Sequence, residues 1–313
     1  MTGGDVVLVA GEDSLIGAAL VRAYARAGVE CVGTAGTDLL DARATEALLA
    51  RVKPGRVFVA AGPTAGIHKN LSNPADLARE NLLVVANVVH AAHLAGVPRL
   101  AYLGSSCCYP RLCEQPMRES LLHTGPVEPS SAAYAAAKMA GMALCGAYAR
   151  QHGRAYFSVI PGDAFGPHDD FSPESSHVVA ALLLRFHEAV RSGAEAVTVW
   201  GTGAARRDFI FVDDLAAALV LLMDRHTADP AGTPVNAGSG QATSIAELAA
   251  AIAAVVGFTG RVVFDTSRPD GMPVKVLDSS RLRELGWAGV RPLGDGLSAS
   301  YQWFLNQQRS VRA

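Results

Sequence analysis

Short apolar runs alternate with helix-periodic stretches along the first half of the chain, and this alternation constrains the fold more than any other feature. The chain opens with the apolar run Val6 to Ala10, a glycine, and the helical stretch Gly17 to Ala27. Further strand-like runs, separated by long helical stretches, are Cys31 to Val32, Arg56 to Ala60, Arg99 to Leu103 and Phe157 to Ile160. Strands connected through helices pair in parallel. The sequence therefore predicts an α/β protein with a doubly wound parallel sheet, covered by helices on both faces.

The regularity weakens after Pro161, where residues 162–176 are rich in Gly, Pro, Asp and Ser. A long irregular segment of this kind is typical of a functional loop. Shorter strand-like and helical stretches follow, which predicts a smaller second lobe of α/β type. We expect a main domain over residues 1–166, with a return segment near 205–240, and the second lobe over most of residues 167–313.

Composition excludes several classes of protein. Half of the 313 residues are hydrophobic, 18% are charged, and the formal net charge is −2, so nothing indicates a disordered chain or a nucleic-acid partner. No apolar run reaches the roughly 20 residues that a membrane span needs, and Met1 to Asp5 lacks a basic leader. The spacing of the five cysteines lacks the second pair of a zinc site. We expect a cytoplasmic protein with reduced thiols, no metal and no membrane contact.

The first strand-to-helix turn, Gly11 to Gly17, keeps only the outer glycines of a G-x-x-G-x-x-G pattern, with Ser14 in the middle. In a doubly wound sheet this turn holds a dinucleotide pyrophosphate, because glycines let the backbone approach the ligand and the helix start offers free N–H groups. A plain turn explains the segment equally well. If the turn binds a dinucleotide, the fold is of Rossmann type and residues 1–166 form the dinucleotide-binding domain. The expected contacts are Gly11, Asp13, Ser14, Leu15, Ile16, Gly17, Ala61, Lys138 and Pro161.

Tyr134 and Lys138 stand four residues apart on a predicted helix, so they share one face. A solvated helix face would show the same spacing. Ser105 follows the predicted strand Arg99 to Leu103, at the edge where such sheets bind ligands. We expect Lys138 to depress the pKa of Tyr134, Tyr134 to exchange a proton with a sugar oxygen, and Ser105 to hold that oxygen.

Around these residues the chain resembles the GDP-L-fucose synthases, the GDP-4-keto-6-deoxymannose 3,5-epimerase/4-reductases among the extended short-chain dehydrogenases. The resemblance runs nearly end to end. Besides Tyr134 and Lys138, it rests on Gly66 to His68, Gly104 to Pro110, Gln115 to Glu119, Gly166 to Asp169, Ser176 to Val178, Trp200 to Gly203, Arg207 to Phe209, Val212 to Leu215, and Arg268 to Gly271.

The resemblance implies roles for individual side chains. Ser105, Tyr134 and Lys138 match the family's redox trio, while Cys107 and His177 match the pair that moves protons at the carbons beside the ketone. A ketone acidifies the neighbouring C–H bonds, and inversion needs a base on one face and an acid on the other. The side chains implied near a GDP-sugar are Arg185, Trp200, Arg207 and Lys275. Taken singly, most of these residues are better explained without a ligand, the cations as exposed surface residues and Trp200 as a core aromatic at the end of a strand.

The resemblance also implies a homodimer built through the helical stretches Pro74 to Leu94 and Ala132 to His152, although core burial explains their apolar character too. Residues 167–313 then form mainly the nucleotide-sugar-binding lobe.

The chain departs from the family pattern around the cofactor and the sugar. Asp13 stands where the family has a basic residue, and Gly33 to Thr37 lacks the Arg that binds the adenosine 2′-phosphate. Each lost charge-assisted bond costs about 1.5–3 kcal/mol, so we expect NAD to be favoured over NADP. Near the sugar, Pro63 and Ala65 replace a lysine and a glycine, and Asp163 replaces an Asn. A carboxylate there is unfavourable without a nearby cation.

Three functions remain open on this basis. The first is the reductive epimerase/reductase of a GDP-4-keto sugar. The second is a redox-neutral NAD-dependent nucleotide-sugar epimerase, or a C4 dehydrogenase, with tightly bound NAD. The third is a non-catalytic dinucleotide sensor, which would have no need to keep five candidate catalytic side chains.

Overall fold

A computed structural model describes residues 6–64, 66–172, 176–226, 229, 231–268 and 270–310. Ala65 and Pro269, which belong to segments discussed above, lie outside the described residues. Among the described residues, no helix combines the length and the apolar character needed to cross a membrane.

The central element is a six-stranded sheet in which every pairing is parallel. Its order is β10-β5-β4-β3-β1-β2. The strands are β1 (Val7–Ala10), β2 (Cys31–Val32), β3 (Arg56–Val59), β4 (Arg99–Leu103), β5 (Ala155–Pro161) and β10 (Val235–Ala237). Alternate residues of each strand face opposite layers, and both faces are buried. The predicted fold class is confirmed.

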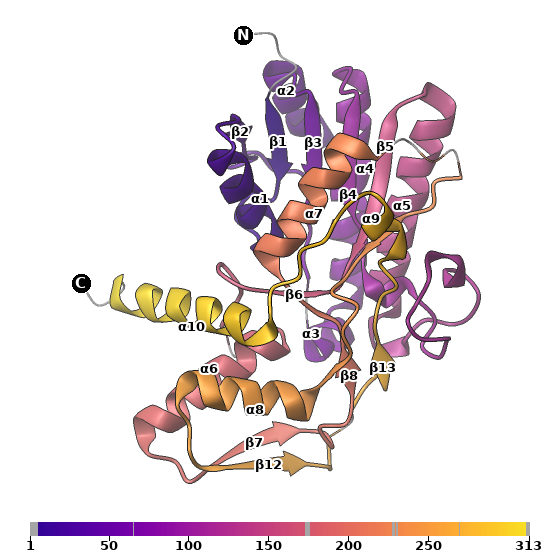
Figure 1. Cartoon of the computed structure of the whole chain (residues 1–313). Coiled ribbons are helices and arrows are strands. Elements are labelled where there is room, and N and C mark those ends of the chain that lie inside the picture. Colours follow the sequence, from indigo (N-terminus) through magenta and orange to yellow (C-terminus); the bar gives the residue numbers. More distant parts are fainter. Residues whose placement is uncertain are drawn as a thin grey trace.

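Helices cover both faces of this sheet (Figure 1). One layer consists of α1 (Leu15–Arg26) and α7 (Val212–Arg225). The other consists of α2 (Ala42–Val52), α4 (Pro74–Leu94) and α5 (Ala132–His152). The last two coincide with the predicted helical stretches, because long periodic segments are the clearest signal in a sequence.

A smaller lobe lies below the sheet in Figure 1, around its own apolar core. It contains α6 (Val178–Ser192), α8 (Ile245–Val256), α10 (Leu293–Ser310), and the parallel pair β7 (Ala196–Trp200) and β12 (Arg261–Asp265). The chain leaves the main sheet after β5 and returns through α7 to β10. The domain boundary at residue 166 stays a prediction.

Short strands join the two parts. They are β6 (Asp163–Phe165) paired with β9 (Phe209–Phe211), and β8 (Arg206–Arg207) between β11 (Thr243–Ser244) and β13 (Val274–Lys275). The remaining short helices are α3 (Ile67–Ser72), α9 (Ser280–Glu284), and the 3₁₀ turns at 106–108, 119–121 and 129–131. The β8–β13 pairing sets Lys275 beside Arg207, although the two residues are far apart in the sequence.

Candidate active site

The turn between β1 and α1 depends on both of its glycines. Gly11 has φ +82°, and a Cβ there would approach Ala61 to 2.8 Å, while a Cβ on Gly17 would collide with the Gly11 carbonyl. Ser14 caps α1: its Oγ accepts from the Gly17 N–H at 3.1 Å and donates to the Gly11 carbonyl at 2.7 Å. The serine therefore replaces the missing middle glycine with a hydrogen-bonded cap.

A cavity of about 430 Å³ opens beside this turn, at the carboxyl ends of β1, β2 and β3. Of the predicted cofactor residues, Gly11, Asp13, Ser14 and Ala61 line it. Leu15, Ile16 and Gly17 begin α1 directly after the cavity-lining residues, and Pro161 ends β5. Close backbone approach together with a helix N-terminus suits a dinucleotide pyrophosphate. The residues present therefore fit a nicotinamide dinucleotide.

Glu12 is a cavity residue that sequence reasoning missed. Its carboxylate accepts from the Thr34 hydroxyl at 3.0 Å and from the Ala35 N–H at 2.7 Å. Partial burial raises the pKa of Glu12, but the hydrogen bonds from Thr34 and Ala35 outweigh this and leave the pKa below its ordinary value. Gly33 makes room, because a Cβ there would clash with the Glu12 side chain. In the sequence, the glycine at position 33 is the one indication of this contact.

The redox group, Ser105, Tyr134 and Lys138, comes together where β4 meets α5. Ser105 follows β4 and hydrogen-bonds Tyr134 through its side chain. The Lys138 Nζ lies 5.7 Å from the centre of the Tyr134 ring and donates to the Leu103 carbonyl at 3.1 Å. Tyr134 is 9% exposed and Lys138 4% exposed, so neither belongs to a solvated helix face. The structure therefore assembles these side chains, and their roles stay a prediction.

The pKa values in the redox group correct one expectation. Burial raises the pKa of Tyr134 far above its ordinary value, with Cys107 and Cys108 contributing, and the Ser105 hydrogen bond only partly opposes this. Lys138, beside the ring, does not bring the phenol pKa back to its ordinary value. Its own pKa falls to about 8, because desolvation disfavours the charged amine. In this buried setting, desolvation outweighs the attraction on which the expectation was based.

The charged group, Asp163, Arg207 and Lys275, comes from β6, β8 and β13. The Lys275 Nζ lies 2.8 Å from Asp163 Oδ1, with side chains 15% and 29% exposed. This is the nearby cation that the carboxylate of Asp163 needs. Arg207 donates to the carbonyls of Met272 and Arg206 at 2.6 and 2.8 Å. Desolvation lowers the pKa of Arg207, while Asp163 and Cys107 raise it, which places Cys107 within electrostatic reach of this group.

Cys107 lies near both groups, whereas His177 lies near the charged group. Cys107 lies in the turn after β4, where its N–H donates to Ser105 Oγ at 3.2 Å. His177 is the N-cap residue of α6, and its side chain makes no capping hydrogen bond. Desolvation lowers its pKa, Lys275 lowers it further, and Asp163 opposes both. A histidine whose pKa lies below its ordinary value is neutral at pH 7, the form that accepts a proton.

Trp200 lies at the end of β7 and is 60% exposed, which rules out the core-aromatic alternative. Two guanidinium groups flank its ring, Arg185 at 5.9 Å and Arg268 at 5.2 Å. Arg185 also donates to the Thr198 carbonyl at 2.6 Å. Arg268 was not predicted, although it begins one of the segments that carry the resemblance.

Comparisons with known proteins agree with this geometry. The sequence pattern described as the NAD dependent epimerase/dehydratase family matches residues 7–238, and the chain belongs to this family. Within it, the chain is 45% identical to GDP-L-fucose synthase of Escherichia coli K12, over 98% of each chain.

Solved structures show the same likeness. A GDP-6-OMe-4-keto-L-xylo-heptose reductase from C. jejuni superposes with a TM-score of 0.91 at 29% identity, covering 98% of this chain and 99% of the other. A GDP-L-fucose synthetase from Naegleria fowleri bound to NADP superposes with a TM-score of 0.89 at 29% identity, covering 100% and 96%.

The NADP-bound relative corrects the expected preference for NAD, which was wrong. That inference counted only the missing cations near the 2′-phosphate. Phosphates also bind backbone N–H groups and hydroxyls. The Thr34 hydroxyl and the Ala35 N–H are bound by Glu12. However, Gly36 and Thr37 of the same cavity wall carry an N–H and a hydroxyl. The absence of an arginine therefore does not exclude NADP.

Proposed function

We propose that the protein is a GDP-sugar epimerase/reductase, which inverts carbons beside a C4 ketone and then reduces the ketone with NADPH. The observation that carries the proposal is that Ser105 contacts both the redox tyrosine and the cysteine of the proton-transfer pair. Ser105 hydrogen-bonds Tyr134 and also accepts from the N–H of Cys107. A substrate ketone held by Ser105 is thereby within reach of both Tyr134 and Cys107.

The reduction needs a proton donor at the ketone oxygen. A bound NADPH supplies the hydride. Tyr134 keeps its proton at neutral pH because burial raises its pKa, so it is the group that protonates the oxygen while Ser105 holds it. The buried amine of Lys138 lies beside the ring and stabilises the phenolate that remains.

The epimerisation needs proton transfer at carbons next to the ketone. Cys107 and His177 serve as the acid/base pair, His177 in its neutral form as the proton acceptor. The ketone oxygen held by Ser105 takes up the enolate charge, which lowers the barrier to removing the neighbouring proton.

The nucleotide end of the substrate lies along the second lobe. Arg207 and Lys275 bind the diphosphate, because paired charge-assisted hydrogen bonds suit phosphate oxygens. The nucleobase stacks on the exposed Trp200, next to Arg185 and Arg268.

The test is a stoichiometric assay with GDP-4-keto-6-deoxymannose and NADPH in heavy water. We expect one NADPH to be consumed for each sugar converted, with deuterium incorporated at the carbons beside the ketone. Cys107→Ala should lose the incorporation at one carbon and still consume NADPH. Conversion of a nucleotide-sugar without net loss of NADPH would instead establish a redox-neutral epimerase.

We also propose a homodimer formed through α4 and α5. Leu82 and Leu94 of α4 are 41% and 59% exposed, and a second copy would cover them. Light scattering after gel filtration should give twice the 32.6 kDa chain mass, and a mass of one chain would refute the dimer.

A further inference from the structure

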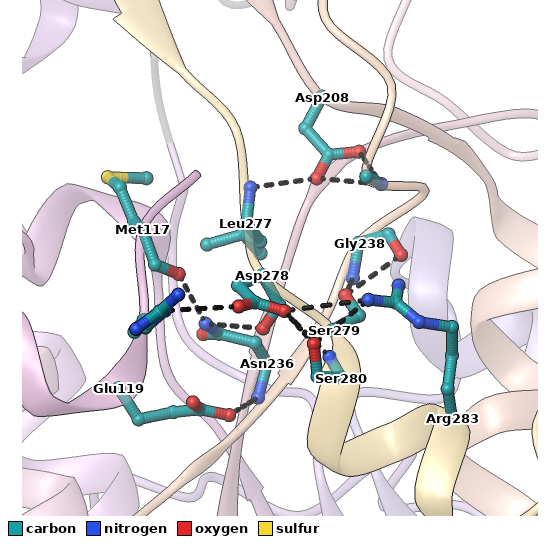
Figure 2. A network of polar contacts seen from close by, with 12 residues as sticks. Met117, Glu119, Asp208, Asn236, Gly238, Leu277, Asp278, Ser279, Ser280 and Arg283 are labelled. Atoms are coloured by element: carbon teal, nitrogen blue, oxygen red, sulfur yellow. Dashed lines mark hydrogen bonds and ion pairs between the residues drawn. The ribbon is translucent and has the colours of Figure 1, made fainter. Parts of the chain in front are cut away.

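The carboxylate of Asp208 is buried between β8 and β9 and is 1% exposed. It accepts hydrogen bonds from the Ser239 N–H at 2.7 Å, the Ser239 hydroxyl at 2.5 Å and the Gly240 N–H at 3.2 Å. It also accepts from the Leu277 N–H at 3.0 Å (Figure 2). A buried carboxylate is costly unless its oxygens are hydrogen-bonded. These donors satisfy both oxygens and bring two distant loops, 239–240 and 277, onto one side chain.

The same residue is connected to each member of the charged group. Arg207 precedes it in the chain. The N–H of Asp163 donates to the Asp208 carbonyl at 2.7 Å. Lys275 lies two residues before Leu277, whose N–H the carboxylate holds, and pairs with Arg207 across β8 and β13. Moving Asp208 would therefore move all three charges.

Asp208 is closely packed against two glycines. A Cβ on Gly162 would lie 2.8 Å from the Asp208 carbonyl oxygen, and a Cβ on Gly238 would clash with its carboxylate. Both glycines follow strands of the main sheet, β5 and β10. The charged group is thus fixed against the rigid sheet through one side chain.

We propose that Asp208 is a positioning residue that holds Arg207, Lys275 and Asp163 in the arrangement that binds the substrate diphosphate. The inference rests on the proposed function, because it takes the diphosphate to be the ligand of these cations. It assigns to Asp208 no contact with the reacting atoms. Loss of the Asp208 carboxylate weakens binding of the nucleotide and leaves the redox group, in the turn after β4 and on α5, in place.

Asp208→Asn tests the proposal in the full-length protein. The amide keeps the shape, offers one acceptor oxygen, and turns N–H donors toward the donors of Ser239, Gly240 or Leu277. We expect the dissociation constant for GDP and the KM for the GDP-sugar to rise about tenfold, which corresponds to about 1.4 kcal/mol. The kcat and the affinity for NADPH should stay within about threefold. A variant with lowered kcat and unchanged KM would overturn the proposal.

Asp278→Asn is the matched control. Asp278 belongs to the same polar region in Figure 2, where its carboxylate accepts from the Ser280 N–H at 2.9 Å and lies 3.5 Å from Arg283. It has no side-chain bond to the charged group among the contacts of the described residues. Its GDP affinity should equal that of the unmodified protein. An equal loss in both variants would show general loosening and refute a specific role for Asp208.

Ser239→Ala keeps the proposal testable if Asp208→Asn does not fold. It removes one hydroxyl donor and keeps the carboxylate, so GDP should bind about threefold more weakly. Unchanged affinity there would count against the proposal.

Binding of inorganic pyrophosphate separates a failure of the proposed function from a failure of the positioning role of Asp208. If the unmodified protein binds pyrophosphate but turns over no GDP-sugar, the proposed function fails, while the effect of Asp208→Asn on pyrophosphate affinity still decides the positioning role.

Discussion

The redox group and the charged group are built in different ways. Ser105 lies in the turn after β4, Tyr134 and Lys138 lie on α5, which packs against the main sheet, and the tyrosine and lysine are buried in apolar surroundings. Asp163, Arg207 and Lys275 come from three short strands that join the two parts of the molecule, and polar contacts hold them. The difference implies that the reaction takes place at the rigid main sheet, whereas the nucleotide binds at the junction between the two parts of the molecule.

The largest expected effect is a loss of turnover with no change in ligand affinity. Tyr134→Phe removes the proton donor, so turnover should fall about a thousandfold while GDP and NADPH affinities stay unchanged. Steady-state kinetics and calorimetry measure the two separately. Tyr148→Phe is the matched control on α5, because the Tyr148 hydroxyl contacts His90 at 2.8 Å outside the site. Substantial turnover by Tyr134→Phe would contradict the assigned role.

The next effect tests how deeply the redox group is buried. The pKa of Lys138 falls from 10.5 to about 8 on folding, so the folded protein binds this proton less tightly than the unfolded chain. Below pH 8 the buried ammonium costs about 3 kcal/mol, and this cost is relieved as the pH rises from about 8 toward 10.5.

Urea unfolding of the unmodified protein and Lys138→Met measures this difference. By a pH of about 9.5, the unmodified protein should gain about 2 kcal/mol relative to the variant. Parallel pH profiles would mean that the amine is solvated in the folded protein.

The smallest expected effect concerns the charged group and tests how the negative charge of Asp163 affects GDP binding. Asp163→Asn removes the negative charge beside Lys275 and nearly keeps the shape, so GDP should bind about fivefold more tightly, or about 1 kcal/mol, at low salt. Titration calorimetry over a salt series measures the gain, which should shrink as salt screens it. Asp213→Asn, which breaks the ion pair with Arg22 at 2.6 Å between α7 and α1, should leave GDP affinity unchanged. Weaker GDP binding by Asp163→Asn would show that the carboxylate itself helps to hold the ligand.

Much of the site's framework was predictable because it is local. The glycine turn follows an apolar run directly, and Tyr134 and Lys138 are one helical turn apart, so spacing alone places them. Glu12 was missed, although it lies in the same turn. Its partners Thr34 and Ala35 are at the end of β2, and that contact exists only once β1 and β2 pair.

The sequence by itself determined the parallel α/β architecture and the geometry of Tyr134 and Lys138, since hydrophobic period and helical spacing are properties of neighbouring residues. Only the tertiary structure decided that Lys275 pairs with Asp163 and that Asp208 joins the loops around them. The physical reason is strand length. β8 and β13 contain two residues each, too few to show a period of two, so their register depends on hydrogen bonds between segments far apart in the chain.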